Sequence, residues 1–272
     1  MISPQDKIII TNAIYFNGDW VMKFDKKKTI QDKFYITDQE TVNAKFMQFT
    51  DSELTKEHAE FYYGQTNDAQ VLELLYAGKE LSMLFILPHE QSLKQLEQEL
   101  TPEKLKTWRA NLRYQGKPTD EEKERIVELI EQKTKQENNE NQKQKEIATL
   151  YQQLQPLKKI SIPRFMFEND YELKETMRAL GMHHAFEEHA DFSKITEYPN
   201  DLFIGSIKHK PFVKVDEEGT EAAAATMVKL IGTTMEVKAF EANRPFLLII
   251  QERSTGYILF IGRMVDPSKA QL

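Results

Sequence analysis

The sequence predicts an α+β protein, and three features of its 272 residues indicate that class. Segments rich in β-branched and aromatic residues recur along the chain, beginning with residues 7–16. Helical patterns are fewer and occur in clusters, after Pro88 and again around residues 171–180. The composition is 40% hydrophobic and 29% charged, which is ordinary for a soluble globular protein of this size. Dominant strands with clustered helices favour an α+β domain.

Composition and charge exclude several function classes. The net charge of −7 gives no reason to expect nucleic acid or an anionic membrane as partner. The chain has no cysteine, which excludes disulfides, thiolate zinc sites and cysteine nucleophiles. No apolar run approaches the roughly 20 residues that span a bilayer. The start, Met1 to Lys7, lacks the apolar core of a signal peptide and resembles a turn that enters a strand, so we expect the chain to begin within a domain.

Most of the expected strands are apolar segments bounded by turn residues. Residues 7–16 (KIIITNAIYF) are apolar on both faces, which predicts a strand buried inside a sheet before the Asn17-Gly18 turn. Residues 71–76 and 81–87, separated by Ala77-Gly78-Lys79-Glu80, predict a hairpin. Further strands are expected at 41–47, 61–64, 160–167 (where a proline favours an edge or a bulge), 202–215, 245–251 and 257–264.

Helices are expected where cap residues precede a helical pattern. One should begin near Ser92, and another should follow Thr101, with Pro102 in its first turn. A third is expected over residues 171–180, ending at Gly181. Residues 113–156 differ, since Glu, Lys, Gln and Asn dominate while apolar residues recur at helical spacing. We interpret 113–156 as a charged, helical insertion, packed against its own domain or serving as a protein-binding arm.

Motifs typical of enzymes are missing from the sequence. It contains no HExxH, no GxSxG, no phosphate-binding loop and no GxGxxG, so we expect no enzymatic activity and no cofactor. His183, His184 and His189, together with Glu187 and Glu188, could form a metal cluster, but the spacing is equally typical of a solvated helix end. The second interpretation is preferred, and no metal site is expected.

Residues 216–226 (DEEGTEAAAAT) are the most informative segment. Four consecutive alanines could begin a helix, but the following residues 227–235 contain β-branched residues and a glycine. In an extended conformation Thr220, Ala222 and Ala224 share one face, while Glu221 and Ala223 share the other. Small residues on the inward face would allow this segment to insert between packed strands without overpacking them. The pattern therefore suits a segment that serves both as an exposed loop and as an inserted strand.

Four motifs together resemble the serpin family of serine-proteinase inhibitors. Residues 217–226 (EEGTEAAAAT) resemble the hinge of the serpin reactive loop, and residues 240–250 (FEANRPFLLII) resemble the family signature downstream of it. Residues 262–267 (GRMVDP) resemble the C-terminal end, and residues 11–20 (TNAIYFNGDW) match a strand and turn beneath the loop. The motifs occur in the family's order over nearly the whole chain. The resemblance implies a serpin fold of mixed β-sheets with peripheral helices and a reactive-centre loop.

The resemblance also implies a mechanism in which the inhibitor is cleaved as a substrate. The cleaved loop inserts into the central sheet, drags the attached proteinase with it and distorts that enzyme's active site, so the native inhibitor is metastable. The implied hinge residues are Glu217, Gly219, Thr220, Glu221, Ala222, Ala223, Ala224, Ala225 and Thr226. Glu217 would pair with Arg164 at the base of the loop, and Trp20 would pack beneath it. Asn12 and His209 would form a hydrogen-bonded pair at the centre of the sheet.

The implied reactive bond joins Thr233 and Thr234, or Thr234 and Met235 when residues are counted back from Arg244-Pro245. Either choice presents threonine, which indicates an elastase-like target and argues against a trypsin-like enzyme. Cleavage after Lys229 or Met235 stays an alternative. The expected partner is thus a serine proteinase. We expect the chain to be a monomer in the extracellular space, with the cytoplasm as the alternative compartment.

The sequence departs from the family pattern at its start. The resemblance begins where the third strand of the central sheet begins, so residues 1–272 match a partial serpin domain that lacks its N-terminal portion. We expect a truncated gene product or gene model that traps proteinases poorly in isolation. The alternative functions are a non-inhibitory or inactive serpin that acts as a carrier or chaperone, and an interaction protein that uses residues 113–156.

Overall fold

The computed structural model describes residues 8–54, 59–89, 92–115, 128, 157–195, 202–217 and 238–270. The chain forms two compact units. One comprises Met1–Asn17, Phe165–Val215 and Leu272, and the other comprises Gly18–Arg164 and Asp216–Gln271. Among the described residues, no helix is long and apolar enough to cross a membrane. The mixed sheets and few helices agree with the predicted α+β class.

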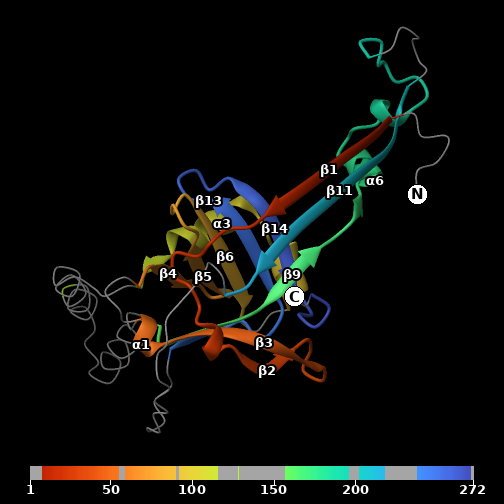
Figure 1. The fold of residues 1–272 in the computed structure, drawn as a ribbon. Helices are drawn as coiled ribbons and strands as arrows, with labels where there is room; N and C mark the ends of the chain where they lie inside the picture. Colours follow the sequence, from red (N-terminus) through yellow and green to blue (C-terminus); the bar gives the residue numbers. More distant parts are fainter. Residues whose placement is uncertain are drawn as a thin grey trace. The chain divides into compact units, whose positions relative to one another are not determined.

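The first unit is organised around its longest strand, β11 (Ile204–Val215). Strand β1 (Ile8–Phe16) runs parallel to β11 along one edge, and the two lie side by side in Figure 1. Strands β9 (Phe165–Glu168) and β10 (Tyr171–Glu172) pair with its other edge in antiparallel orientation. The expected strand at 202–215 is therefore confirmed and forms the centre of a four-stranded sheet.

The expectation that residues 7–16 are buried inside a sheet is wrong. Strand β1 exists, but Ile10, Ile14 and Tyr15 are exposed, Tyr15 by as much as 65%. Among the described strands, β1 pairs with β11 alone. Residue type correctly indicates an extended segment, but burial depends on what covers the two faces, and that is decided by other parts of a protein.

The second unit contains two sheets. Its six-stranded sheet has the order β14-β13-β6-β5-β4-β7, and its four-stranded sheet has the order β12-β8-β3-β2. The strands are β2 (Ile30–Tyr35), β3 (Thr41–Thr50), β4 (Phe61–Gln65), β5 (Ala69–Leu75), β6 (Leu81–Pro88), β7 (Arg113–Tyr114), β8 (Lys159–Pro163), β12 (Ala239–Glu241), β13 (Phe246–Glu252) and β14 (Ile258–Met264). The expected hairpin of β5 and β6 is confirmed, and its turn places Gly78 and Lys79 at positive φ, at 89° and 62°.

The helices of the second unit begin at the expected caps. Ser92 accepts a hydrogen bond from the Gln95 amide ahead of α2 (Leu93–Gln98), and Thr101 caps α3 (Pro102–Ala110) with proline in the first turn. Leu96 and Trp108 of these helices pack against buried side chains of the six-stranded sheet. The same unit also contains a short helix, α1 (Asp51–Leu54), and a 3-10 turn, η1 (Lys26–Lys28).

Two segments differ in detail from the predicted elements. Residues 171–180 divide into β10 and helix α6 (Lys174–Ala179), because Tyr171 and Glu172 pair with β11 before the helix begins. Residues 160–167 divide into β8, which ends at Pro163, and β9, which begins at Phe165. These two strands belong to different sheets, so Arg164 lies at the point where the chain leaves one sheet for another. Most of the expected insertion 113–156 lies outside the described residues.

Candidate functional site

The site begins where strand β11 ends and the chain turns into Asp216 and Glu217. Both acidic residues are buried, and Glu217 is only 2% exposed. Residues 218–237, which follow directly, lie outside the described residues. The structure places Trp20 and Arg164 against this pair of acidic residues, so residues far apart in the sequence meet at one point.

Trp20 binds the backbone of the segment rather than a side chain. Its indole Nε1 donates a hydrogen bond of 3.0 Å to the carbonyl oxygen of Asp216. The ring is buried and stacks on Tyr76, with 4.4 Å between ring centroids and 13° between their planes. A β-bridge between Trp20 and Tyr76 fixes the tryptophan backbone as well. The ring stack, the β-bridge and the hydrogen bond therefore hold the indole against the backbone of Asp216.

The carboxylate of Glu217 is held by two groups from separate elements. The Nε atom of Arg164 lies 3.2 Å from Oε2 of Glu217. The hydroxyl of Thr29, which precedes β2, donates a short hydrogen bond to Oε1. The amide of Arg164 donates to the carbonyl oxygen of Lys45 on β3, which positions the arginine. A carboxylate this deeply buried needs such partners, because removal from water strongly disfavours an unpaired charge.

The contact between Arg164 and Glu217 is an ion pair without a well-aligned hydrogen bond. Within the part of the chain that the structure describes, neither Nε of Arg164 nor Oε2 of Glu217 has a hydrogen-bond partner, although the two atoms are 3.2 Å apart. Charge attraction at this distance persists regardless of angle, whereas a hydrogen bond weakens steeply with misalignment. The arginine thus neutralises Glu217, and the directional hydrogen bond comes from Thr29.

The described chain resumes after residue 237 in the same compact unit. Lys238 precedes β12, and its ammonium lies over the ring of Tyr63, 5.1 Å from the centroid. Burial lowers the pKa of Lys238 to about 8. The undescribed segment 218–237 is therefore bounded by the buried Glu217 on one side and the partly buried Lys238 on the other.

Asn12 and His209 lie directly opposite each other in the register of β1 and β11. Paired residues of parallel strands project to the same face, so the two side chains are neighbours. No hydrogen bond joins the side chains of these two described residues. The His209 ring instead stacks near Tyr171, at 6.4 Å between centroids. Their role as an opening pair in the sheet stays a prediction.

The other predicted site residues fall outside the described part of the chain. These are the hinge residues Gly219, Thr220, Glu221, Ala222, Ala223, Ala224, Ala225 and Thr226, and the reactive-bond residues Thr233, Thr234 and Met235. Sequence reasoning missed Thr29 and Tyr76. Thr29 is separated from Glu217 by 188 residues and sits in no motif, so nothing in the sequence connects the two.

Comparison with protein families gives one match that covers nearly the whole chain. The family model described as "Serpin (serine protease inhibitor)" matches residues 1–124 and 118–267. Human Serpin B3 is 33% identical over 273 residues, which cover 98% of this chain and 57% of that protein. Bovine Serpin B8 is 38% identical, with 98% and 59% covered. Bovine leukocyte elastase inhibitor is 32% identical, with 98% and 60% covered. The chain spans little more than half the length of these curated relatives.

Solved structures show the same fold. Human thyroxine-binding globulin, solved with its ligand, has a TM-score of 0.69 and 26% sequence identity, with 98% of this chain and 58% of that chain covered. Mouse protein-Z dependent protease inhibitor has a TM-score of 0.70 at 23% identity, with 98% and 57% covered. The second likeness concerns the fold alone.

Proposed function

This chain belongs to the serpin family, and from that premise we propose that it acts on a serine proteinase as an inhibitor, not as an enzyme. The inhibitory segment is residues 218–237, which follow the buried Glu217. The observation that supports this most strongly is the anchored base of that segment. Trp20, Thr29 and Arg164 hold Asp216 and Glu217 in place, so the segment beyond them leaves from a fixed point.

The proposed reaction begins as ordinary proteolysis. The proteinase's serine Oγ attacks the carbonyl carbon of Thr233, the peptide bond to Thr234 breaks, and the new amine of Thr234 leaves with the proton. An ester then joins Thr233 to the proteinase. Hydrolysis of this ester by water would release both proteins, so inhibition requires that the freed segment moves before water attacks.

The composition of residues 219–226 suits that movement. The alternation places Thr220, Ala222 and Ala224 on one face, and side chains of this size add little volume when a strand enters a packed sheet. Glu221 lies on the other face, where its charge can stay in water. A bulky or charged residue on the inward face would slow insertion, and the ester would then be hydrolysed.

The proposed target is a proteinase of elastase-like specificity. Threonine at position 233 or 234 is small and β-branched, and it suits a modest, uncharged specificity pocket. It offers no cation to an enzyme of trypsin-like specificity. One similar relative is named leukocyte elastase inhibitor, which is consistent with this target class. Cleavage after Lys229 would instead indicate a trypsin-like target, and cleavage after Met235 would place the bond two residues beyond Thr233.

The test is incubation of the 272-residue chain with elastase, chymotrypsin and trypsin at several molar ratios. In keeping with the poor trapping expected from the sequence, we expect a minor SDS-stable complex with elastase beside an excess of cleaved chain, and mass spectrometry should locate the acylated residue at Thr233 or Thr234. Cleavage within 218–237 without a stable complex would contradict inhibition and favour a non-inhibitory binding protein. Exclusive cleavage after Lys229 would keep inhibition but overturn the elastase-like target.

A further inference from the structure

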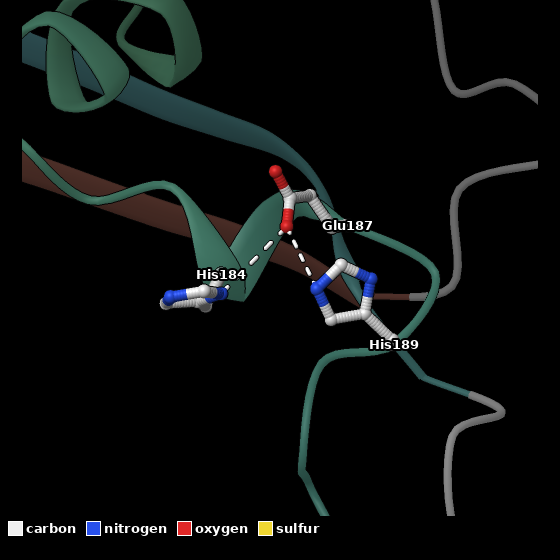
Figure 2. Close-up of side chains that lie close together, drawn as sticks. All are labelled: His184, Glu187 and His189. Carbon is white, nitrogen blue, oxygen red and sulfur yellow. Dashed lines mark ion pairs between the residues drawn. The ribbon is translucent and has the colours of Figure 1, made fainter.

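The first compact unit holds a cluster of metal-ligating side chains that includes none of the residues of the site described above. His184, Glu187 and His189 place one ligand atom each within 4.8 Å of one another. The Nε2 atom of His189 lies 2.9 Å from Oε2 of Glu187, and Nδ1 of His184 lies 3.7 Å from the same oxygen. Figure 2 shows the two imidazole rings on either side of the carboxylate.

The backbone of this segment is fixed on both sides of the carboxylate. His184 begins the 3-10 turn η2 (His184–Phe186), and the buried Phe186 packs with Ile204 and Ile207 of β11. Ala190 is also buried, and its amide donates to the carbonyl oxygen of Glu187. The buried Phe186 and Ala190 thus lie among the three ligands in the sequence, and the backbone they anchor holds the three polar side chains together on the solvent side. Sequence spacing alone favoured a solvated helix end, because it does not reveal this turn.

We propose that His184, Glu187 and His189 bind a divalent transition metal, with Zn²⁺ as the best match. Two imidazoles and one carboxylate are ligands that zinc accepts, whereas Mg²⁺ and Ca²⁺ prefer oxygen alone. Tetrahedral zinc with bonds of about 2.0–2.1 Å places its ligand atoms about 3.3 Å apart. The separations of 2.9 and 3.7 Å to the shared carboxylate lie on either side of that value. Three protein ligands leave a fourth position for water.

Little free energy opposes metal binding at this site. His184 and His189 are exposed and Glu187 is partly exposed, and solvent-accessible ion pairs contribute little to stability, so zinc would displace only weak His–Glu contacts. Small rotations of exposed imidazoles would bring all three atoms to bonding distance. Glu188 and Asp191, both exposed, add negative charge beside the cluster and favour a cation there. The site is independent of proteinase inhibition and is expected to persist in a chain whose loop cannot insert.

The test is titration of the full chain with ZnCl₂ by isothermal calorimetry, with MgCl₂ as the comparison salt. We expect one zinc per chain and no comparable magnesium binding. Glu187→Gln and His189→Ala should each weaken zinc binding by about tenfold or more. His183→Ala is the matched control, because His183 neighbours the cluster but is not part of it. Circular dichroism of each variant should confirm that the fold is unchanged.

A second measurement separates this site from zinc bound at other histidines. Co²⁺ should give the intense visible absorption of low-coordinate sites with the parent chain and lose it in the triple variant His184→Ala, Glu187→Gln, His189→Ala. Two results would overturn the proposal. The parent chain could bind no stoichiometric zinc, or the triple variant could bind zinc and Co²⁺ as the parent does.

Discussion

Arg164 and Glu217 meet across 3.2 Å between Nε and Oε2, and the two partners differ sharply in their exposure to water. The Glu217 side chain is 2% exposed, whereas the Arg164 side chain is 28% exposed. The glutamate has therefore lost almost all its hydration, and the arginine has kept part of its own. Removal of the arginine would leave a buried, uncompensated charge, while removal of the glutamate would leave a cation that can still contact water.

This asymmetry predicts unequal effects of substitution on stability. Arg164→Ala should lower the free energy of unfolding by about 3 kcal/mol, because the Glu217 carboxylate stays buried without its cation. Glu217→Gln should cost less, and the double variant should be more stable than the sum of the two single effects predicts. Urea unfolding of the four proteins measures this cycle. Additive effects would show that the two side chains do not interact.

Trp20 combines a ring stack with a hydrogen bond, and two substitutions separate them. Trp20→Phe keeps an aromatic ring on Tyr76 but removes the donor to the Asp216 carbonyl oxygen, so it should cost about 1–2 kcal/mol. Trp20→Ala should cost about 3–5 kcal/mol, because it also leaves a cavity. Thermal unfolding measures both. Equal losses would mean that the hydrogen bond accounts for the whole effect and the stack for none.

Lys238 predicts a rise of stability with pH. Burial lowers its pKa from 10.5 to about 8, so between pH 8 and 10 the unfolded chain keeps a proton that the folded chain has released. Stability rises with pH wherever the unfolded state binds more protons. Above pH 10 the neighbouring Tyr63 opposes the rise, because burial raises its pKa to about 12 and only the unfolded tyrosine ionises readily.

The control for Lys238 is Lys238→Met, which removes the titrating ammonium and keeps a side chain of similar length. Urea unfolding between pH 8 and 10 should show a positive slope for the parent chain and a smaller slope for the variant. Identical slopes would mean that the lysine is hydrated in the folded state.

Thr220 tests the insertion step proposed for residues 218–237. Thr220→Arg places a cation on the inward face of the alternating segment, so the proteinase should cleave the chain and escape rather than stay bound. Glu221→Arg adds the same side chain one residue later, on the outward face, and should retain inhibition. The measurement is the ratio of SDS-stable complex to cleaved product for each variant. Equal ratios would argue against insertion in the predicted register.

Several elements could be predicted from local sequence because local physical chemistry specifies them. Ser92 and Thr101 begin helices because their hydroxyls accept hydrogen bonds from otherwise unpaired amides. The turn at Gly78 joins β5 and β6 because glycine adopts positive φ without strain. For Tyr171 and Glu172 the local pattern predicts a helix instead, because nothing in their own sequence reveals that β11 lies beside them.

The sequence by itself determined the family, the α+β class and two of the residues, Trp20 and Arg164, that lie against Asp216 and Glu217. Motifs such as 217–226 and 240–250 preserve residue types in order, and that information is local to the chain. Only the tertiary structure decided that Thr29 satisfies Glu217, that β1 is exposed, and that His184, Glu187 and His189 converge. Each of these outcomes depends on which segments the fold brings together in space, and spacing along the sequence does not specify that.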